Sequence, residues 1–489
     1  SFKTATMKNQ LLLTGPGAFQ SWTRRKFFKR CTACMAGLSF LPYLNISAFD
    51  NRIFFSGGSV TKARVKAIFA YPTPDEPNWP NIGYDFDGKI GEIRGLLSEK
   101  CPGIEFIPVS TMDGSAENGK KILNEDPDVE GYAVFHVGCL WGDLTETIAS
   151  SGKPTVLVDH LYAGSGEFLT SYAAMKRAGH KVTGVSSSDF DDVAEAVNCF
   201  DCLHKLKEST ILVVGSKADE QITNVYGTRL LDVSFEEMNN AYHNIDPGEA
   251  KEVAAGWIDG AEKVIEPTEA EIVKSASIYL AMKNLMQKHN AHAITINCLG
   301  GIYSGNLVEA YPCLGFMQLD NDGYVGACEA DQRSAMTKLI MTCLAGRPGF
   351  ISDPVIDTSK NQIIYAHCIG PTRVYGPDGP SNPYHIRSHS EDRKGACNRS
   401  LMPLGEMVTT LQFDHLKKQV IFHQGKSAEN VDEDMACRTK LAVEVKGDIS
   451  KLLNYWDQWG WHRVSFFGDL KEPVSHLASL MGFQVLEEA

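Results

Sequence analysis

The chain has 489 residues, with 43% hydrophobic and 22% charged residues, which is ordinary for a globular protein. This length is enough for two to four domains. The formal net charge of −13 argues against a nucleic-acid-binding protein, because phosphates attract basic surfaces. No apolar run reaches the roughly 20 residues of a membrane-spanning helix, so we expect no span in the mature chain.

The N-terminal segment resembles an export signal. Arg24 and Arg25 precede a weakly apolar run over residues 31–44, and small residues follow as far as Ala48. Paired arginines before such a run are typical of twin-arginine signals, which export folded proteins. The alternative is a basic amphipathic helix. We expect residues 1–49 to be this leader and the mature protein to be periplasmic or otherwise extracytoplasmic.

Residues 50–207 alternate between strand-like and helix-like segments. The segments VKAIFAYP, GIEFIPVS, GYAVFHVG and PTVLVDH have the apolar character of buried strands. The segments between and after them, such as GKIGEIRGLLSEKC and GEFLTSYAAMKRAG, have helical periodicity. This alternation predicts a Rossmann-like α/β domain with a parallel sheet that is covered on both faces.

A second α/β domain is predicted for residues 208–344. The alternation restarts at STILVVGS, and a long helical pattern begins at TEAE with the Thr-x-x-Glu spacing of a capping box. The strand-like AHAITINCLGG then ends in glycines. Ligands of open α/β sheets bind at the carboxyl ends of strands, so this edge is a candidate for the site.

The remaining residues, 345–489, are predicted to form a mostly β, barrel-like domain. Proline and glycine cluster in GRPGF and GPTRVYGPDGPSNP, and short alternating segments such as EMVTTLQFD, KKQVIFHQG and TKLAVEV follow. This texture is typical of antiparallel β structure. The fold class is therefore α/β, with two Rossmann-like domains followed by a β-rich C-terminal domain that ends in the helix-like EPVSHLASLMG.

Thirteen cysteines are present, and two of them fall in the leader. The odd number that remains is scattered through apolar segments, which does not indicate a disulfide framework. We expect reduced, buried thiols. Cys199 and Cys202 form a lone CxxC, which is a weak signal and indicates packing cysteines.

Two carboxylates lie within residues 323–357, the stretch with the densest candidate chemistry. Glu329 follows the strand-like YVGAC, and Asp353 follows the short strand-like GFIS. The helical pattern QRSAMTKLIMTCLAG lies between them, so one crossover helix could bring both side chains to one site. The alternative is structural, with Glu329 capping that helix and Asp353 in a turn before Pro354.

Several imidazoles could complete such a site. His462 lies in QWGWHRVSFFGD, His367 in AHCIG, and His385, Arg387 and His389 in YHIRSH. A carboxylate pair with an imidazole is a plausible donor set for a hard or borderline divalent cation.

These residues carry a resemblance to the L-fucose isomerase and L-arabinose isomerase family. The supporting stretches are INCLGG, CEADQRSAMTKLI with GRPGFISDP, AHCIGP, and WHRVSFFGDLKEPVSHLASLMGF, in the order in which that family has them. The resemblance covers about residues 208–489 and is vaguer before that. It implies an intramolecular oxidoreductase that interconverts aldoses and ketoses. It also implies a homo-oligomer, either a trimer or a hexamer.

The resemblance further implies that Glu329, Asp353 and His462 bind a divalent cation, typically Mn2+. In such isomerases a proton moves between C1 and C2 through a cis-enediol while the cation stabilises the developing charge. Glu329 and Asp353 would then be both ligands and the acid/base pair. His367, Arg387 and His389 are candidate sugar contacts.

Metal selectivity connects this site with the leader. Mn2+ ranks low in the Irving–Williams order, so an empty site outside the cytoplasm would tend to take copper or zinc. Folding around the cation before export avoids this competition.

Two other functions stay open. The chain could be a non-catalytic, exported sugar-binding protein on the same fold, or a metal-dependent lyase or epimerase that shares the enediol. An NAD enzyme is disfavoured because VVGSKADEQ and NCLGGIYSG lack the G-x-G-x-x-G spacing. A serine hydrolase has no nucleophile-elbow motif to support it.

Overall fold

The computed structural model describes residues 61–489. The predicted leader, residues 1–49, lies outside the described residues, as do the paired arginines on which it depends. Within the described part of the chain, no helix combines the length and the apolar character that crossing a bilayer requires.

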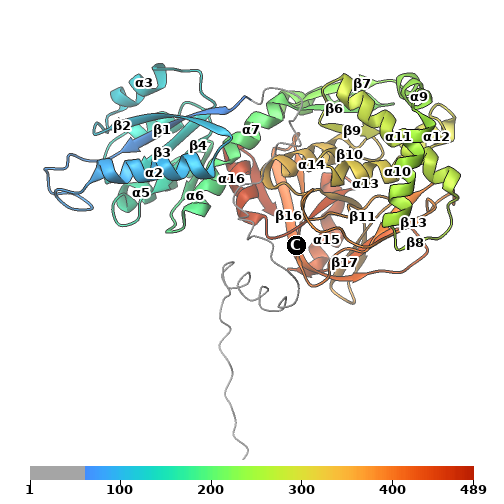
Figure 1. Ribbon diagram of the computed structural model, residues 1–489. Helices are drawn as coiled ribbons and strands as arrows, with labels where there is room; N and C mark the ends of the chain where they lie inside the picture. The colour runs from blue at the N-terminus through green and yellow to red at the C-terminus, as the bar shows by residue number, and fades with distance from the viewer. Residues whose placement is uncertain (1–60) are drawn as a thin grey trace, which may run out of the picture. The chain divides into compact units, whose positions relative to one another are not determined.

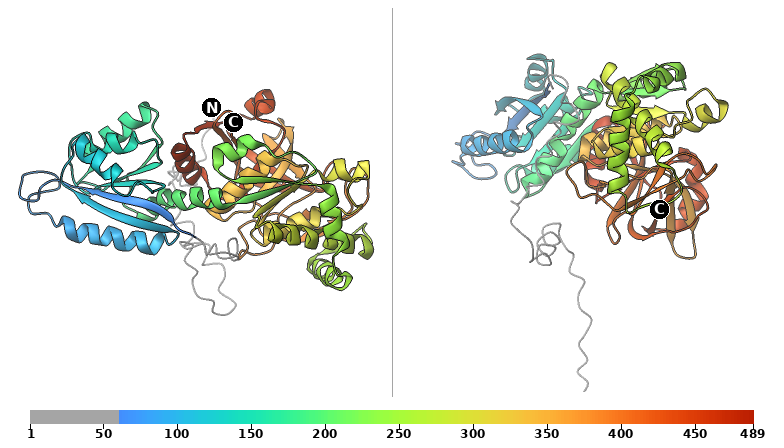
Figure 2. Two further views of the ribbon diagram at one scale, coloured as in Figure 1. Left: turned by 90° about the horizontal axis from the view of Figure 1, so that it is seen from above. Right: turned by 45° about the vertical axis from the view of Figure 1, so that its right-hand side comes forward.

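The first sheet contains five parallel strands in the order β2-β1-β3-β4-β5 (Figure 1). The strands are β1 Ala63–Ala70, β2 Ile104–Thr111, β3 Gly131–His136, β4 Thr155–Asp159 and β5 Val182–Val185. The helices are α2 Phe86–Lys100, α3 Ala116–Asn124, α4 Leu144–Ala149, α5 Ser165–Arg177, α6 Phe190–Val197 and α7 Cys199–Glu208. Apolar residues of α2, α6 and α7 pack on one face, and those of α3, α4 and α5 on the other (Figure 2). This is the predicted sheet with both faces covered.

The second sheet contains four parallel strands in the order β10-β9-β6-β7. These are β6 Thr210–Val214, β7 Arg229–Val233, β9 Ala293–Ile296 and β10 Val325–Ala327. The helices of this region are α8 Glu220–Tyr226, α9 Phe235–His243, α10 Pro247–Gly260, α11 Glu269–Lys288, α12 Cys298–Ser304, α13 Cys313–Asn321 and α14 Gln332–Ala345. The capping box predicted at TEAE is confirmed, because Thr268 and Glu271 exchange both hydrogen bonds at the start of α11.

The third part is a six-stranded antiparallel barrel, closed by pairing of β15 with β16. Its strands are β11 Phe350–Asp357, β12 Gln362–His367, β15 Met407–Asp414, β16 Gln419–Asn430, β17 Thr439–Lys446 and β18 Arg463–Phe467. Outside the closed ring are the short strand β19 Gln484–Glu487, which adds to β16, and a small sheet of β8 Lys263–Val264, β13 Tyr384–Arg387 and β14 Cys397–Ser400. The remaining helices are α15 Ile449–Tyr455, the 3-10 turn η2 Trp456–Trp459 and α16 Lys471–Met481. The predicted fold class is thus confirmed.

The helix α14 connects the second sheet to the barrel. It begins at the Asp331 cap and ends at Gly346, which has a φ of 61°. A left-handed residue at that position favours glycine, so the glycine of LAG ends the helix. Inside the helix, the ammonium of Lys338 donates to both carboxylate oxygens of Asp320 at 2.8 and 2.7 Å, and both side chains are buried.

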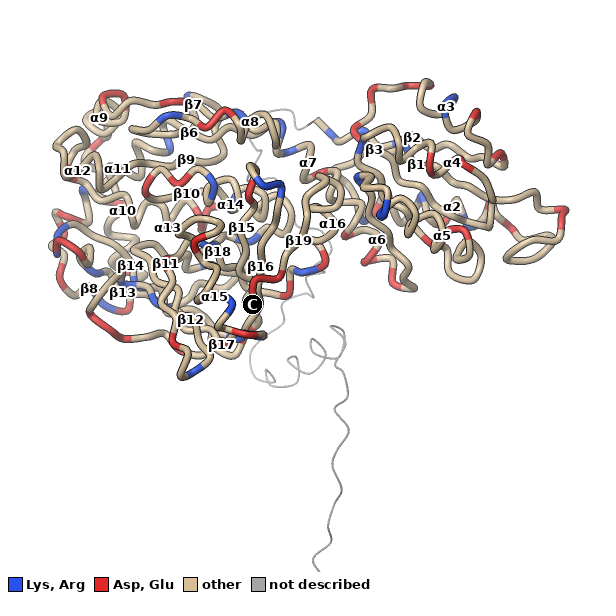
Figure 3. Tube along the Cα trace, turned by 180° about the vertical axis from the view of Figure 1, so that it is seen from behind, with Lys and Arg blue, Asp and Glu red and all other residues tan. Residues whose placement is uncertain are grey.

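The cysteines of the described residues are free thiols, and all except the half-buried Cys437 are buried. Cys199 and Cys202 pack in the hydrophobic core beside the first sheet, in agreement with their interpretation as packing residues. Acidic and basic residues are interspersed along the described trace (Figure 3).

Candidate functional site

Strand register in the barrel brings Asp353 and His462 together. Ser352 of β11 pairs with Arg463 of β18 in an antiparallel register. Asp353, which follows Ser352, therefore lies beside His462, which precedes Arg463. His462 Nε2 is accordingly 3.1 Å from Asp353 Oδ1. The prediction that Asp353 follows a strand is wrong in detail, because Asp353 and Pro354 are inside β11.

Pro354 fits within this strand for a simple reason. The pairing of β18 with β11 covers only Phe350–Ser352, whereas β12 pairs with β11 from Asp353 onward. One edge of β11 is therefore unpaired at Pro354, and a residue without an N–H costs no ladder hydrogen bond there.

Glu329 reaches the same place from the second sheet. It follows β10 and Cys328, and both Glu329 and Ala330 have left-handed backbones, with φ of 62° and 52°. Such angles are unfavourable for residues with a Cβ and concentrate at functional sites. The Ala330 N–H donates to Ile296 O of β9 at 2.9 Å, which fixes the turn. Glu329 Oε2 lies 3.8 Å from His462 Nε2.

Asp331 orients His462. Its carboxylate is 2.8 Å from His462 Nδ1, while it also caps α14 by accepting from the N–H of Ser334 at 3.0 Å. Because Asp331 engages Nδ1, the nitrogen that faces Glu329 and Asp353 is Nε2. A carboxylate behind a histidine in this way is the usual support for a metal-binding imidazole.

The charges of the site are unbalanced without a cation. Within residues 61–489, the ion pairs of Glu329, Asp331 and Asp353 are all with histidine. Burial opposes the charged imidazole of His462, but its hydrogen bond to Asp331 and the nearby carboxylate of Asp353 raise its pKa to about 10. Burial, with the neighbouring carboxylates of Asp353 and Asp331, raises the pKa of Glu329.

This donor set fits a divalent cation. His462 Nε2 is buried and has no hydrogen-bond partner, although it faces two carboxylates. Two carboxylate oxygens and one imidazole nitrogen suit a hard or borderline ion such as Mn2+. Glu329, Asp353 and His462 are therefore residues that could hold it, with Asp331 behind them. His367 places a ligand atom within 4.8 Å of those of Glu329 and His462 and could be a further ligand.

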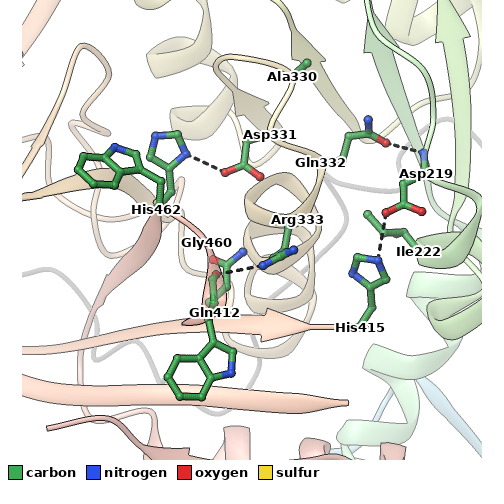
Figure 4. Close-up of a pocket in the computed structure, with 12 residues that line it drawn as sticks. Asp219, Ile222, Ala330, Asp331, Gln332, Arg333, Gln412, His415, Gly460 and His462 are labelled. Carbon is green, nitrogen blue, oxygen red and sulfur yellow. Dashed lines mark hydrogen bonds and ion pairs between the residues drawn. The ribbon is translucent and has the colours of Figure 1, made fainter. Parts of the chain in front are cut away.

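A pocket of about 330 Å³ opens beside this cluster (Figure 4). Its walls come from the start of α8, the start of α14, β15 and the segment before β18; the lining residues are Asp219, Ile222, Ala330, Asp331, Gln332, Arg333, Gln412, His415, Trp459, Gly460, Trp461 and His462. The far wall is held by polar contacts: Asp219 Oδ2 is 3.0 Å from His415 Nε2, and the Asp219 N–H donates to Gln332 Oε1 at 2.7 Å. The walls thus combine polar side chains with two tryptophans, which suits a small ligand with both polar and apolar faces.

The three predicted sugar-contacting residues lie at different distances from the carboxylates. His367 ends β12, is buried, and points Nε2 toward Glu329 Oε1 at 3.8 Å. His389 is also buried, 3.4 Å from Asp392. Arg387 instead donates to Glu266 at 2.8 Å from the small sheet. Contact of these three residues with a substrate stays a prediction.

Several residues of the site were not predicted from the sequence. Asp331 could have been found, because an aspartate just before a helical pattern is a typical cap and lies two residues after Glu329. The Nε1–H of Trp461 donates to Asp353, and Asp219 and His415 form the opposite wall. These depend on tertiary pairing between segments that are distant in the sequence.

Among curated proteins, the chain is similar to sulfoquinovose isomerases. It is 21% identical to that of Clostridium sp. (strain MSTE9) over 295 residues, which cover 57% of this chain and 64% of the relative. It is 24% identical to that of Priestia megaterium over 238 residues, 47% of this chain and 52% of the relative. The aligned parts thus span between about half and just under two thirds of these relatives. The chain is a distant homologue of sulfoquinovose isomerases.

No protein-family model matches the chain. Among solved structures, a chain described as the XylFII molecule is similar at 16% identity, covering 50% of this chain and 85% of that one. The TM-score of 0.15 is too low for any further conclusion.

Proposed function

We propose that this protein is an aldose–ketose isomerase that depends on a divalent cation, with Mn2+ the expected ion. The observation that carries this proposal is the convergence of Glu329 and Asp353, from two other segments, on the buried Nε2 of His462, at 3.8 and 3.1 Å. Distant homology to sulfoquinovose isomerases supports the same class of reaction.

The residues of the chain divide the chemistry among them. A bound cation would act as a Lewis acid toward the carbonyl and hydroxyl oxygens of the sugar. Glu329 is suited to take and return the proton that moves between C1 and C2, because burial and nearby carboxylates raise its pKa toward neutrality. Its left-handed backbone, with a φ of 62°, places the carboxylate 3.8 Å from His462 Nε2. Asp353 and His462 hold the cation, and Asp331 keeps His462 in the required tautomer.

The pocket favours a small polyhydroxylated substrate. Asp219, Gln332, Gln412 and His415 offer donors and acceptors, while Arg333 adds a positive charge. Sulfoquinovose is included among the candidate substrates because the curated relatives carry its name. Which aldose is used depends on which of these side chains contact the end of the sugar remote from the cation.

Export and self-association are further parts of this proposal. The arginine pair Arg24 and Arg25 supports export by the twin-arginine route, and the family resemblance supports a homo-oligomer. The alternatives are a sugar-binding protein or a lyase on the same fold. The isomerase is distinguished from both because it converts a bound aldose into a ketose.

The test is a screen of pentoses, hexoses, deoxyhexoses and sulfoquinovose with Mn2+-loaded protein, with ketose formation followed by NMR. We expect conversion of at least one aldose. Glu329→Gln should abolish turnover without unfolding, since the amide keeps the shape and loses the base. Glu309→Gln is the matched control, because Glu309 is exposed and pairs with Lys394, and it should keep full activity. Binding without conversion by the wild type would favour the binding protein.

A further inference from the structure

A cluster of thiols lies directly behind the carboxylates. The Sγ atoms of Cys328 and Cys368 are 3.8 Å apart, and Cys368 Sγ is 3.4 Å from His367 Nδ1. The ligand atoms of these three residues all lie within 4.8 Å of one another, and all three side chains are buried. Cys313, at the start of α13, is a further buried thiol in the hydrophobic cluster that holds Cys328 and Cys368.

We propose that this cluster is a second metal site, in which Cys313, Cys328, Cys368 and His367 Nδ1 bind one Zn2+. Three cysteines and one histidine form one of the common sets for structural zinc. The donors come from the end of β10, the end of β12 and the start of α13, so the cation would tie the second sheet to the barrel. This proposal does not depend on the isomerase activity.

The observed spacing matches the geometry of tetrahedral zinc. Zinc–sulfur bonds of about 2.3 Å place two ligand sulfurs about 3.8 Å apart, and a zinc–nitrogen bond of about 2.0–2.1 Å places sulfur and nitrogen about 3.6 Å apart. The separations of 3.8 Å and 3.4 Å are close to both values. A disulfide between Cys328 and Cys368 would need a sulfur separation of about 2.05 Å, so the side chains would have to move.

The two sites meet at His367. Its Nδ1 faces the thiols, and its buried Nε2 has no hydrogen-bond partner and faces Glu329 at 3.8 Å. Zinc on Nδ1 would keep a proton on Nε2, directed at Glu329. Histidine ligands commonly donate their second N–H to a carboxylate, which fixes both groups. The carboxylate-rich site would thus select the harder Mn2+, and the adjacent thiolate-rich site would select Zn2+.

The test is Co2+ substitution of the full-length protein, followed by absorption spectroscopy and metal analysis. We expect one equivalent of thiolate-bound metal per chain, with thiolate-to-cobalt charge-transfer bands. Cys328→Ser and Cys368→Ser should lose the bands, while Glu329→Gln should keep them. Cys343→Ser is the matched control, because Cys343 is also a buried thiol but belongs to a different hydrophobic cluster from Cys328 and Cys368.

X-ray absorption on the zinc-loaded wild type keeps the proposal testable if the cysteine variants do not fold. We expect about three sulfurs at about 2.3 Å and one nitrogen at about 2.0–2.1 Å. A shell of oxygen and nitrogen only would overturn the proposal. So would bands that persist in Cys328→Ser, or a metal-free wild type whose mass shows a Cys328–Cys368 disulfide.

Discussion

Replacing Asp331 with asparagine separates the support of the cation site from the stability of the fold. Asp331 performs two tasks, because it caps α14 through Ser334 and holds His462 Nδ1 at 2.8 Å. Asparagine caps helices about as well as aspartate, so the capping contribution to folding stability should fall by less than about 1 kcal/mol. Loss of the carboxylate behind a histidine ligand typically weakens metal binding about 10–100-fold, or about 1.4–2.7 kcal/mol.

The pH dependence of this loss is also fixed by the site. Without a cation, the pKa of His462 is raised to about 10, so a proton competes for Nε2 at neutral pH. Asp331→Asn lowers that pKa and relieves part of the competition. The loss of Mn2+ affinity, measured by calorimetry, should therefore be larger at pH 9 than at pH 7. The control is Asp448→Asn, since Asp448 caps α15 through Ser450. Unchanged Mn2+ affinity in folded Asp331→Asn protein at both pH values would refute the role of Asp331.

Three other predictions follow from the charged groups. Protonated His462 stabilises the cation-free fold, and this contribution is fully present below about pH 6.5. It is lost as pH rises through the raised pKa of about 10. The urea concentration at the unfolding midpoint should therefore fall more steeply between pH 7 and pH 10 in the wild type than in His462→Gln. Lys338→Met leaves Asp320 buried without its partner and should cost about 3–5 kcal/mol in urea unfolding, whereas Lys338→Met with Asp320→Leu should recover most of it; equal stability of the two variants would contradict this. Changing Arg24 and Arg25 to lysine should leave the precursor in the cytoplasm on cell fractionation, and normal export would exclude the twin-arginine route.

The fold could be predicted because local patterns and global architecture agree. Apolar strands that alternate with helical periodicity leave few choices besides parallel sheets, and the capping box at Thr268 and the stop at Gly346 are local signals that tertiary packing did not override. The exception is Asp353, which was placed after the short strand-like GFIS. The strand continues because β12 pairs with it from Asp353 onward, whereas β18 pairs only as far as Ser352, and this is a property of the barrel rather than of the local sequence.

The site was predicted less completely, because its members meet through register and topology. Glu329, Asp353 and His462 were identified from their order and from the family resemblance, and the structure brings them together. Their role as ligands stays a prediction. The opposite wall of the pocket, at Asp219 and His415, was missed. Asp219 caps α8 and His415 follows β15 of the barrel, and no sequence periodicity relates the two positions.

Isomerisation in D2O tests the central claim most directly. Mn2+-loaded protein is incubated with an aldose that it binds, and the product is analysed by NMR and mass spectrometry. The account predicts a ketose that carries deuterium at the carbon to which the proton is transferred, and no ketose with Glu329→Gln. Recovery of the bound aldose unchanged, with the cation in place, would contradict the account and identify the protein as a sugar binder.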